Sequence, residues 1–290
     1  MQLKSLMTGL ISGLLAFPVF AEDGLEIIGQ PLAEGIGFQP AATKLARDLQ
    51  WLDGLVLIII TAITLFVLGL LAYVILRYNR KANPVPETFT HNSPVEVAWT
   101  VVPIIILVFI GAFSLPVLFD QQKIPEGEVN IKVTGYQWYW GYEYVDEGFE
   151  FESFLIGEGK VLTPEVELEL REAGYSRDQF LLATDTSVVV PVNKTVVMQV
   201  TGADVIHSWT IPAFGVKQDA VPGRLGQLWF KAEKEGIYFG QCSELCGKDH
   251  AYMPITVKVV SQDAYNAWLS AAKSEYAGTS QSYNIAEVSE

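Results

Sequence analysis

Two long apolar stretches without charged residues constrain this chain more than any other feature. Residues 55–76 and 97–119 contain no Asp, Glu, Lys or Arg. As helices, each would be about 33 Å long, enough to cross the ~30 Å hydrocarbon core of a bilayer. Trp51 and Trp99 lie near ends of the stretches, where aromatic side chains anchor at membrane interfaces. We therefore predict a transmembrane helix hairpin over residues 51–120.

The start of the chain resembles a signal peptide. Lys4 supplies a positive end, an apolar stretch too short to span a bilayer follows, and Val19-Phe20-Ala21 offers a cleavage site. We predict removal of residues 1–21, which leaves residues 22–50 as an external N-terminal segment. An uncleaved anchor is the alternative.

The loop between the apolar stretches indicates the orientation. It carries Arg77, Arg80 and Lys81 close to a helix end, as cytoplasmic loops do, although Lys44 and Arg47 on the opposite flank weaken the contrast. Two crossings return the chain to the side of its N-terminus, so we predict a two-pass membrane protein with both termini outside the cytoplasm. That side is the periplasm if the membrane is a bacterial inner membrane, or the equivalent compartment elsewhere.

Beyond the second stretch the pattern changes to strands. Residues 129–134 alternate apolar and polar side chains, and we expect this strand to continue through the aromatic run at 136–144. Residues 145–184 are less regular and read as an insertion. Further short strands and a helix are predicted at 187–192, 195–201, 207–211, 225–232, 237–241, 255–260 and 262–276. Strands of this length and spacing predict a β-sandwich or barrel over residues 121–276, followed by a tail at 277–290.

The external part is acidic. Residues 120–290 contain 25 Asp and Glu against 13 Lys and Arg, a net charge of −12. Such a field repels nucleic acid and attracts basic partners. Solubility alone explains much of it, so a basic docking partner is a hypothesis that the charge permits.

Candidate metal ligands gather near the C-terminus. Cys242, Cys246, His250 and Met253 lie in the run GQCSELCGKDHAYMP, together with Glu244, and His207 lies 35 residues before Cys242. Thiolates, imidazoles and a thioether together are typical of copper electron-transfer sites. Mononuclear blue-copper sites use one Cys, whereas two thiolates can bridge two copper ions.

Three other readings of these residues remain open. A disulfide leaves the His and Met unexplained, and a structural zinc site has no use for Met253. The third is a set of core and surface residues that binds no metal.

Four motifs carry a resemblance to a known family. They are Tyr136-Gln-Trp-Tyr-Trp140, His207-Ser-Trp209, Asp219-Ala-Val-Pro-Gly-Arg-Leu225 and Gly240-Gln-Cys-Ser-Glu-Leu-Cys-Gly247. With the helix hairpin, they make the chain closely resemble subunit II of cytochrome c oxidase, of the bacterial, mitochondria-like type, over about residues 40–270.

The resemblance implies a cupredoxin-like external domain that holds a dinuclear copper centre, CuA. It implies that Cys242 and Cys246 bridge the coppers and that His207 and His250 each bind one. Met253 is then a weak ligand. The backbone carbonyl of Glu244 completes the set, and its side chain binds a Mg or Mn ion at the boundary with subunit I. On residues alone, Glu244 reads equally well as a polar loop residue.

Further roles follow only from the resemblance. Trp138 matches the position where electrons enter, although strand aromatics usually serve as core and rim. Glu143, Asp146 and Asp204 would belong to an acidic docking face for cytochrome c. Glu96 would lie at a proton entry of subunit I; the alternative is a helix N-terminal charge stabilised by the helix dipole.

The chain alone lacks the residues for oxygen chemistry. Its apolar stretches contain no His, the third His is His91, and no Cys-x-x-Cys-His motif offers a covalent haem site. The resemblance therefore implies an oxidoreductase and translocase subunit without haem. It would pass electrons from cytochrome c to the haem of subunit I, for oxygen reduction coupled to proton pumping, in contact with subunit III and lipid.

Other functions compete with this interpretation. A membrane-anchored copper-delivery or thiol-redox protein can use two Cys at this spacing, but such proteins adopt a thioredoxin-like fold and keep an open metal site. A structural zinc module needs neither an acidic face nor an exposed aromatic run. A nitrous oxide reductase needs a large additional domain.

Overall fold

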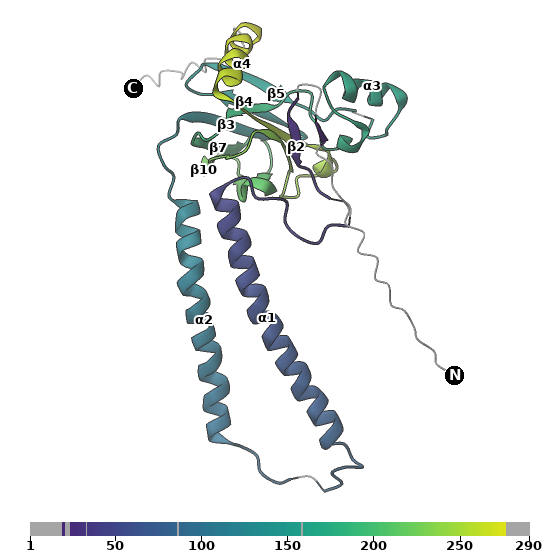
Figure 1. Ribbon diagram of the computed structural model, residues 1–290, viewed down its shortest axis with the longest axis vertical. Helices are drawn as coiled ribbons and strands as arrows, with labels where there is room; N and C mark the ends of the chain where they lie inside the picture. Colours follow the sequence, from purple (N-terminus) through teal and green to yellow (C-terminus); the bar gives the residue numbers. More distant parts are fainter. Residues whose placement is uncertain (1–18, 21–23, 33, 86, 158, 277–290) are drawn as a thin grey trace, which may run out of the picture.

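A long helix hairpin joined to one end of a β domain makes up the protein (Figure 1). The computed structural model describes residues 19–20, 24–32, 34–85, 87–157 and 159–276 of the 290. Most of the predicted leader and the whole predicted tail at 277–290 lie outside the described residues.

The two predicted transmembrane helices are confirmed. They are α1 (Lys44–Arg77) and α2 (Ser93–Gln122), of 34 and 30 residues, and the side chains of Thr43 and Asn92 cap their first turns. Each helix has an 18-residue apolar window of which no part is buried inside the protein. The rings of Trp51 and Phe113 meet edge-on at 5.7 Å near the domain, and the helices separate toward the connecting loop (Figure 1).

The start of α1 is bonded to the β domain. Thr43 Oγ1 donates to the carbonyl of Phe214 at 2.7 Å, and the Arg47 guanidinium makes two hydrogen bonds to Glu233, at 2.6 and 2.9 Å. Lys44 Nζ lies 3.0 Å from Asp120 and so links the beginning of α1 to the end of α2. The domain is therefore held on the hairpin by direct contacts as well as by the chain that connects them.

Two five-stranded sheets form the β domain, as the sandwich prediction requires. One sheet has the order β1-β2-β11-β12-β6, the other the order β10-β7-β3-β4-β5, and β8 pairs separately with β9. The bounds of the first sheet are β1 (Val19–Phe20), β2 (Glu26–Gly29), β11 (Gly236–Gln241), β12 (Pro254–Val260) and β6 (Val188–Pro191). Those of the second are β10 (Gly226–Phe230), β7 (Val196–Gly202), β3 (Val129–Tyr136), β4 (Tyr139–Tyr144) and β5 (Phe149–Ser153).

Aromatic side chains pack between the two sheets, and their buried polar atoms are hydrogen-bonded. Residues of β3 and β4 alternate between buried and half-buried, as strands with one face on a core do. The buried Tyr144 hydroxyl donates to the carbonyl of Val189 at 2.7 Å and accepts from its N–H at 3.0 Å, which joins β4 to β6 in the other sheet. The buried indole of Trp209 donates to the Tyr142 hydroxyl at 3.3 Å.

The aromatic run is not one strand, so that prediction was wrong. Tyr136 pairs with Tyr139 across an antiparallel hairpin, and Gln137 and Trp138 form the two-residue turn between β3 and β4. Residues of high β propensity fill the whole run, and the turn carries no Gly, Pro, Asn or Asp that would mark it. The turn places Trp138 at the tip of the hairpin.

Several other elements differ from the sequence pattern. β5 lies inside the stretch expected to be irregular, with Phe149 and Phe151 buried, and β9 (Val216–Ala220) was not predicted. β2 lies in residues 22–50, the segment predicted to be external, and pairs in parallel with β11. The remaining elements are β8 (His207–Ile211), α3 (Pro164–Glu172), α4 (Gln262–Glu275) and the 3-10 turns η1 (Arg177–Gln179), η2 (Pro212–Phe214) and η3 (His250–Tyr252).

Candidate metal centre

One loop and one neighbouring strand build the site. Gln241 at the end of β11 pairs with Pro254 at the start of β12, so residues 242–253 form a single loop closed by a strand pair. His207 is the first residue of β8, and the N–H of Ser243 donates to the carbonyl of Ser208 at 3.0 Å. That hydrogen bond brings the loop against β8 and so places His207 beside it.

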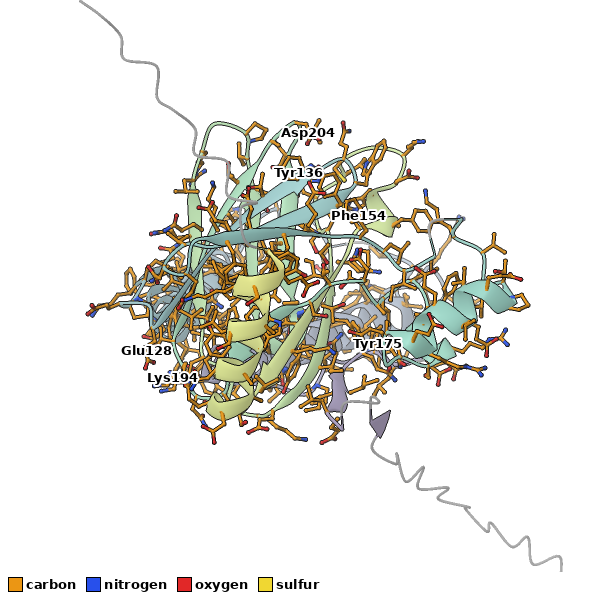
Figure 2. The ribbon with its side chains drawn as sticks, turned by 90° about the horizontal axis from the view of Figure 1, so that it is seen from above. Glu128, Tyr136, Phe154, Tyr175, Lys194 and Asp204 are labelled. Atoms are coloured by element: carbon orange, nitrogen blue, oxygen red, sulfur yellow. The ribbon has the colours of Figure 1, made fainter. Side chains whose placement is uncertain are left out.

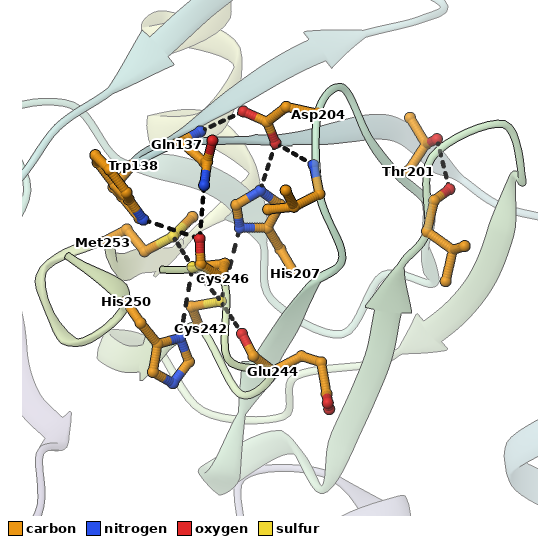
Figure 3. A network of polar contacts seen from close by, with 12 residues as sticks. Gln137, Trp138, Thr201, Asp204, His207, Cys242, Glu244, Cys246, His250 and Met253 are labelled. Atoms are coloured by element: carbon orange, nitrogen blue, oxygen red, sulfur yellow. Dashed lines mark hydrogen bonds and ion pairs between the residues drawn. The ribbon is translucent and has the colours of Figure 1, made fainter. Parts of the chain in front are cut away.

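The two cysteines lie at the centre, each with one histidine (Figure 3). Their Sγ atoms are 3.9 Å apart and form no disulfide. His207 Nδ1 lies 3.9 Å from Cys242 Sγ, and His250 Nδ1 lies 3.5 Å from Cys246 Sγ. His207, Cys242 and Cys246 are buried, and their donor atoms all fall within 4.8 Å of one another, close enough to share a metal ion.

A thioether and a carbonyl complete the set. Met253 Sδ lies 3.5 Å from Cys246 Sγ and is buried, and the carbonyl oxygen of Glu244 lies 3.3 Å from Cys242 Sγ. The Glu244 side chain is exposed and points away from the sulfur atoms (Figure 3). All six residues singled out from the sequence therefore meet at one place, and two soft thiolates with imidazoles and a thioether suit copper.

Asp204 orients the imidazole of His207. Its carboxylate lies 2.9 Å from His207 Nε2, and it accepts from the backbone N–H of Gln137 at 2.8 Å and of Val205 at 2.6 Å. A carboxylate only accepts, so this contact keeps a proton on Nε2 and leaves the Nδ1 lone pair facing Cys242. Asp204, which we expected on a docking face, thus contacts His207 on the side of the ring away from the cysteines.

The thiol pair gives up its first proton easily and its second with difficulty. Burial opposes ionisation of both, but contacts with His207 and the loop backbone lower the pKa of Cys242 to about 7. Burial and the charge on Cys242 raise the pKa of Cys246 to about 12. The proton loss belongs to the pair, and a cation between the sulfur atoms would favour loss of both protons.

The aromatic hairpin holds the ligand loop. Gln137 Nε2 and Trp138 Nε1 both donate to the carbonyl of Cys246, at 2.8 and 3.2 Å. Trp140 Nε1 donates to the carbonyl of Met253 at 3.1 Å. Trp138 is half-buried and Trp140 fully buried, so the first reaches the surface while the second belongs to the core.

The other acidic residues expected for docking lie in the second sheet and in the turn between β4 and β5. Glu143 of β4 makes an ion pair of 2.9 Å with Lys132 of β3, and Asp146 accepts from Asn130 Nδ2 at 2.8 Å. Seen from above, Asp204, Tyr136 and Phe154 lie along the same side of the domain (Figure 2).

The structure does not bring Glu96 to the metal site. It lies in the first turn of α2, at the end of the hairpin away from the β domain, and accepts from the N–H of Asn92 at 3.1 Å. The expected role of Glu96 at a proton entry of subunit I stays a prediction.

Sequence reasoning assigned no role to three residues that support the site: Gly135, Gln137 and Trp140. Gly135 lies directly behind His207: a Cβ at Gly135 would come within 2.8 Å of His207 Cδ2. The glycine immediately before the aromatic run was the available signal, because an isolated Gly in a strand often marks a close approach.

Comparisons with known proteins agree on one family. Residues 129–260 match the family described as "Cytochrome C oxidase subunit II, periplasmic domain", and residues 31–117 match "Cytochrome C oxidase subunit II, transmembrane domain". Cytochrome c oxidase subunit 2 of Cereibacter sphaeroides is 66% identical over 269 residues, which cover 90% of this chain and 89% of the relative. Cytochrome c oxidase subunit 2 of Arabidopsis thaliana is 40% identical and covers 81% of this chain and 88% of its own.

One solved structure among the matches is the periplasmic domain of subunit II of cytochrome oxidase from Bradyrhizobium japonicum. It is 48% identical, covers 53% of this chain and 99% of its own, and has a TM-score of 0.45.

The protein is thus a membrane protein with two transmembrane helices and a cupredoxin-like periplasmic domain. The cluster of His207, Cys242, Cys246 and Met253 is consistent with a CuA site. Because it is 66% identical to Cereibacter sphaeroides subunit 2 over 90% of its length, the chain belongs to the cytochrome c oxidase subunit II family.

Proposed function

We propose that this subunit holds a dinuclear copper centre, accepts electrons from cytochrome c there and passes them to the haem of subunit I. The observation that carries the proposal is the meeting of two free, buried thiols with Met253, His207 and His250 at separations of 3.5 to 3.9 Å. Cys242, Cys246, His207 and His250 would be the strong ligands, and Met253 and the Glu244 carbonyl the weak ones.

Copper at this site supplies one-electron redox chemistry. The protein would fix the positions of the ligands and exclude water from them. Asp204 fixes the His207 tautomer, the hairpin tip and Trp140 hold two loop carbonyls, and strand pairing closes the loop at both ends. A ligand set that moves little between redox states lowers the structural cost of each electron transfer.

Trp138 is the proposed entry point for electrons. Its half-buried ring lies at the hairpin tip, and its Nε1 hydrogen bond to Cys246 gives a short route from the surface to a ligand. Glu143, Asp146 and Asp204 would help to attract a basic cytochrome c, as the net charge of −12 over residues 120–290 favours. Asp204 would then serve both docking and the orientation of His207.

The remaining roles concern partners in the membrane. The exposed apolar sides of α1 and α2 would pack against subunits I and III and lipid, and both termini would lie in the periplasm. The exposed Glu244 carboxylate would bind a Mg or Mn ion at the boundary with subunit I, since carboxylates suit hard cations. Glu96 would lie at a proton entry of subunit I.

Metal analysis and EPR test the proposal most directly. The full-length protein in detergent, loaded with copper, should contain two coppers per chain and show one unpaired electron shared between them, with seven hyperfine lines. Cys242→Ser should lose this signal, because a single remaining thiolate cannot bridge as two do. One copper with four hyperfine lines, or an unchanged spectrum in Cys242→Ser, would contradict it.

A further inference from the structure

Asp249 begins the short turn that presents His250, yet it does not cap that turn. It stands at the N-cap position of η3, where an Asp side chain usually accepts a hydrogen bond from the next backbone N–H groups. Here the side chain makes no such bond. Its carboxylate Oδ1 contacts Lys160 Nζ instead, with the two side chains 21% and 30% exposed.

Lys160 makes a second contact with the same turn. Its ammonium lies 4.4 Å from the ring centroid of Tyr252, the last residue of η3. A cation over an aromatic face is attracted by the ring, more strongly where water is partly excluded. The Lys160 side chain therefore contacts Asp249, directly before His250, and Tyr252, directly before Met253.

The predicted insertion, residues 145–184, contains Lys160 and packs against the β domain. The inserted residues pack through Ile156, Leu170 and Tyr175 in an apolar cluster with Ile237 and Phe239 of β11. β11 is the strand that leads into Cys242. The insertion is thus seated on the same strand that carries the ligand loop.

The backbone at Lys160 is itself unusual. Its φ is +56°, a conformation that non-glycine residues rarely adopt, and its N–H donates to the carbonyl of Gly157 at 2.9 Å. Such a conformation persists where the surroundings determine it. The tight turn directs the side chain onto Asp249 and Tyr252.

We infer that Lys160 is a positioning residue: from the insertion, it holds the turn that carries His250 and Met253 and balances the Asp249 charge beside them. The link to copper rests on the proposed function above. The ordering of the turn does not depend on copper.

The charge balance gives opposite signs for the two partners. Without the Lys160 cation, the Asp249 carboxylate next to His250 keeps only the exposed Lys248, 3.8 Å from its other oxygen. The less compensated negative charge favours the more positive, oxidised centre, so the reduction potential falls. Without the carboxylate, the Lys160 cation is unpaired and the potential rises. If the contact only kept the turn in place, both changes would shift the potential in the same direction.

The experiment compares full-length Lys160→Met, Lys160→Arg, Asp249→Asn and the Lys160→Met/Asp249→Asn double variant. In metal-free protein, hydrogen exchange of the segment His250–Met253 should be about tenfold faster in Lys160→Met, and near wild type in Lys160→Arg; copper should also dissociate about tenfold faster. The potential should fall in Lys160→Met, rise in Asp249→Asn and return toward wild type in the double variant.

Lys248→Met is the matched control. Lys248 lies 3.8 Å from the other oxygen of Asp249 but is 76% exposed, so loss of its charge should leave exchange and copper dissociation close to wild type. Exchange in Lys160→Met equal to that of the wild type, or equal shifts in Lys160→Met and Lys248→Met, would overturn the inference. A wild-type protein that fails to bind two coppers would refute the proposed function, while the metal-free exchange still decides the role of Lys160.

Discussion

At the scale of single residues, each ligand depends on what touches its other side. His207 has Cys242 at Nδ1, Asp204 at Nε2 and Gly135 behind the ring. An imidazole nitrogen by itself can serve in many kinds of site. The contacts behind it decide its tautomer and its position.

Replacing Gly135 tests the contact behind His207. The Cβ of Gly135→Ala would lie 2.8 Å from His207 Cδ2 and displace the ring, so we expect copper content to fall several-fold. Gly141→Ala is the control, because its Cβ comes no closer than 3.1 Å, to the outer edge of the Tyr136 ring. Equal copper content in both variants, measured by metal analysis, would contradict this expectation.

Replacing Met253 tests the weak ligand. Met253→Leu keeps most of the buried volume but removes the thioether, so we expect retained copper and a raised reduction potential. The buried Met198 of β7 lies outside the cluster, and Met198→Leu should leave the potential unchanged. Redox titration of both variants checks this. A potential unaltered in Met253→Leu would remove Met253 from the ligand set.

The sequence predicted the six residues that meet at the metal centre but not the residues that support them. Cys242, Cys246 and His250 could be identified because their chemistry and close spacing lie within one loop. Gly135 and the second role of Asp204 depend on a hairpin turn and on the pairing of distant strands. Composition and periodicity do not predict contacts between residues that are distant in the sequence.

At the scale of elements, the junction between α1 and the domain rests on close backbone packing. Gly215 has a φ of +68°, and a Cβ there would lie 2.6 Å from the Cα of Ala46 in α1. The apolar stretches predicted both helices, but not that α1 begins against η2. That contact depends on the left-handed Gly215, which is far along the chain from Lys44, the first residue of the helix.

Gly215→Ala should weaken this junction. Strain at positive φ and the clash with Ala46 together should lower the free energy of unfolding by about 1–3 kcal/mol. Gly223→Ala serves as the control, because Gly223 has a φ of +75° with no atom within 4 Å of its Cβ, so the variant should lose only about 1 kcal/mol. Thermal unfolding in detergent measures both, and equal losses would show that packing on α1 contributes nothing.

At the scale of the whole molecule, charge and exposed apolar surface lie in different places. The helices expose apolar sides that only lipid or other subunits can cover, while the residues after α2 carry the net charge of −12. Composition alone predicted this division. It did not predict that part of the acidity is neutralised locally, as Lys132 does for Glu143.

The proposed role of the acidic face in docking can be tested by comparing it with an equal change of charge on α3. We expect Glu143→Gln/Asp146→Asn to raise the KM for a basic cytochrome c several-fold at low salt, and the difference to vanish at high salt. Glu169→Gln/Glu172→Gln on α3 removes the same charge outside the second sheet. Steady-state oxidation of cytochrome c by the assembled complex provides the measurement. Equal effects of the two double variants would leave only net charge as the cause.

The pairing of β2 with β11 has a consequence for biosynthesis. β2 is made before either helix, and its partner strand is made some 200 residues later, after both helices. The two strands can meet only if the chain has crossed the membrane an even number of times between them. Until β11 has been made, the edge of β2 that pairs with it has no partner strand, and an unpaired strand edge can pair with other chains. A chain in which only one of the two helices has crossed would leave β2 and β11 on opposite sides of the membrane, so this part of the sheet could not form.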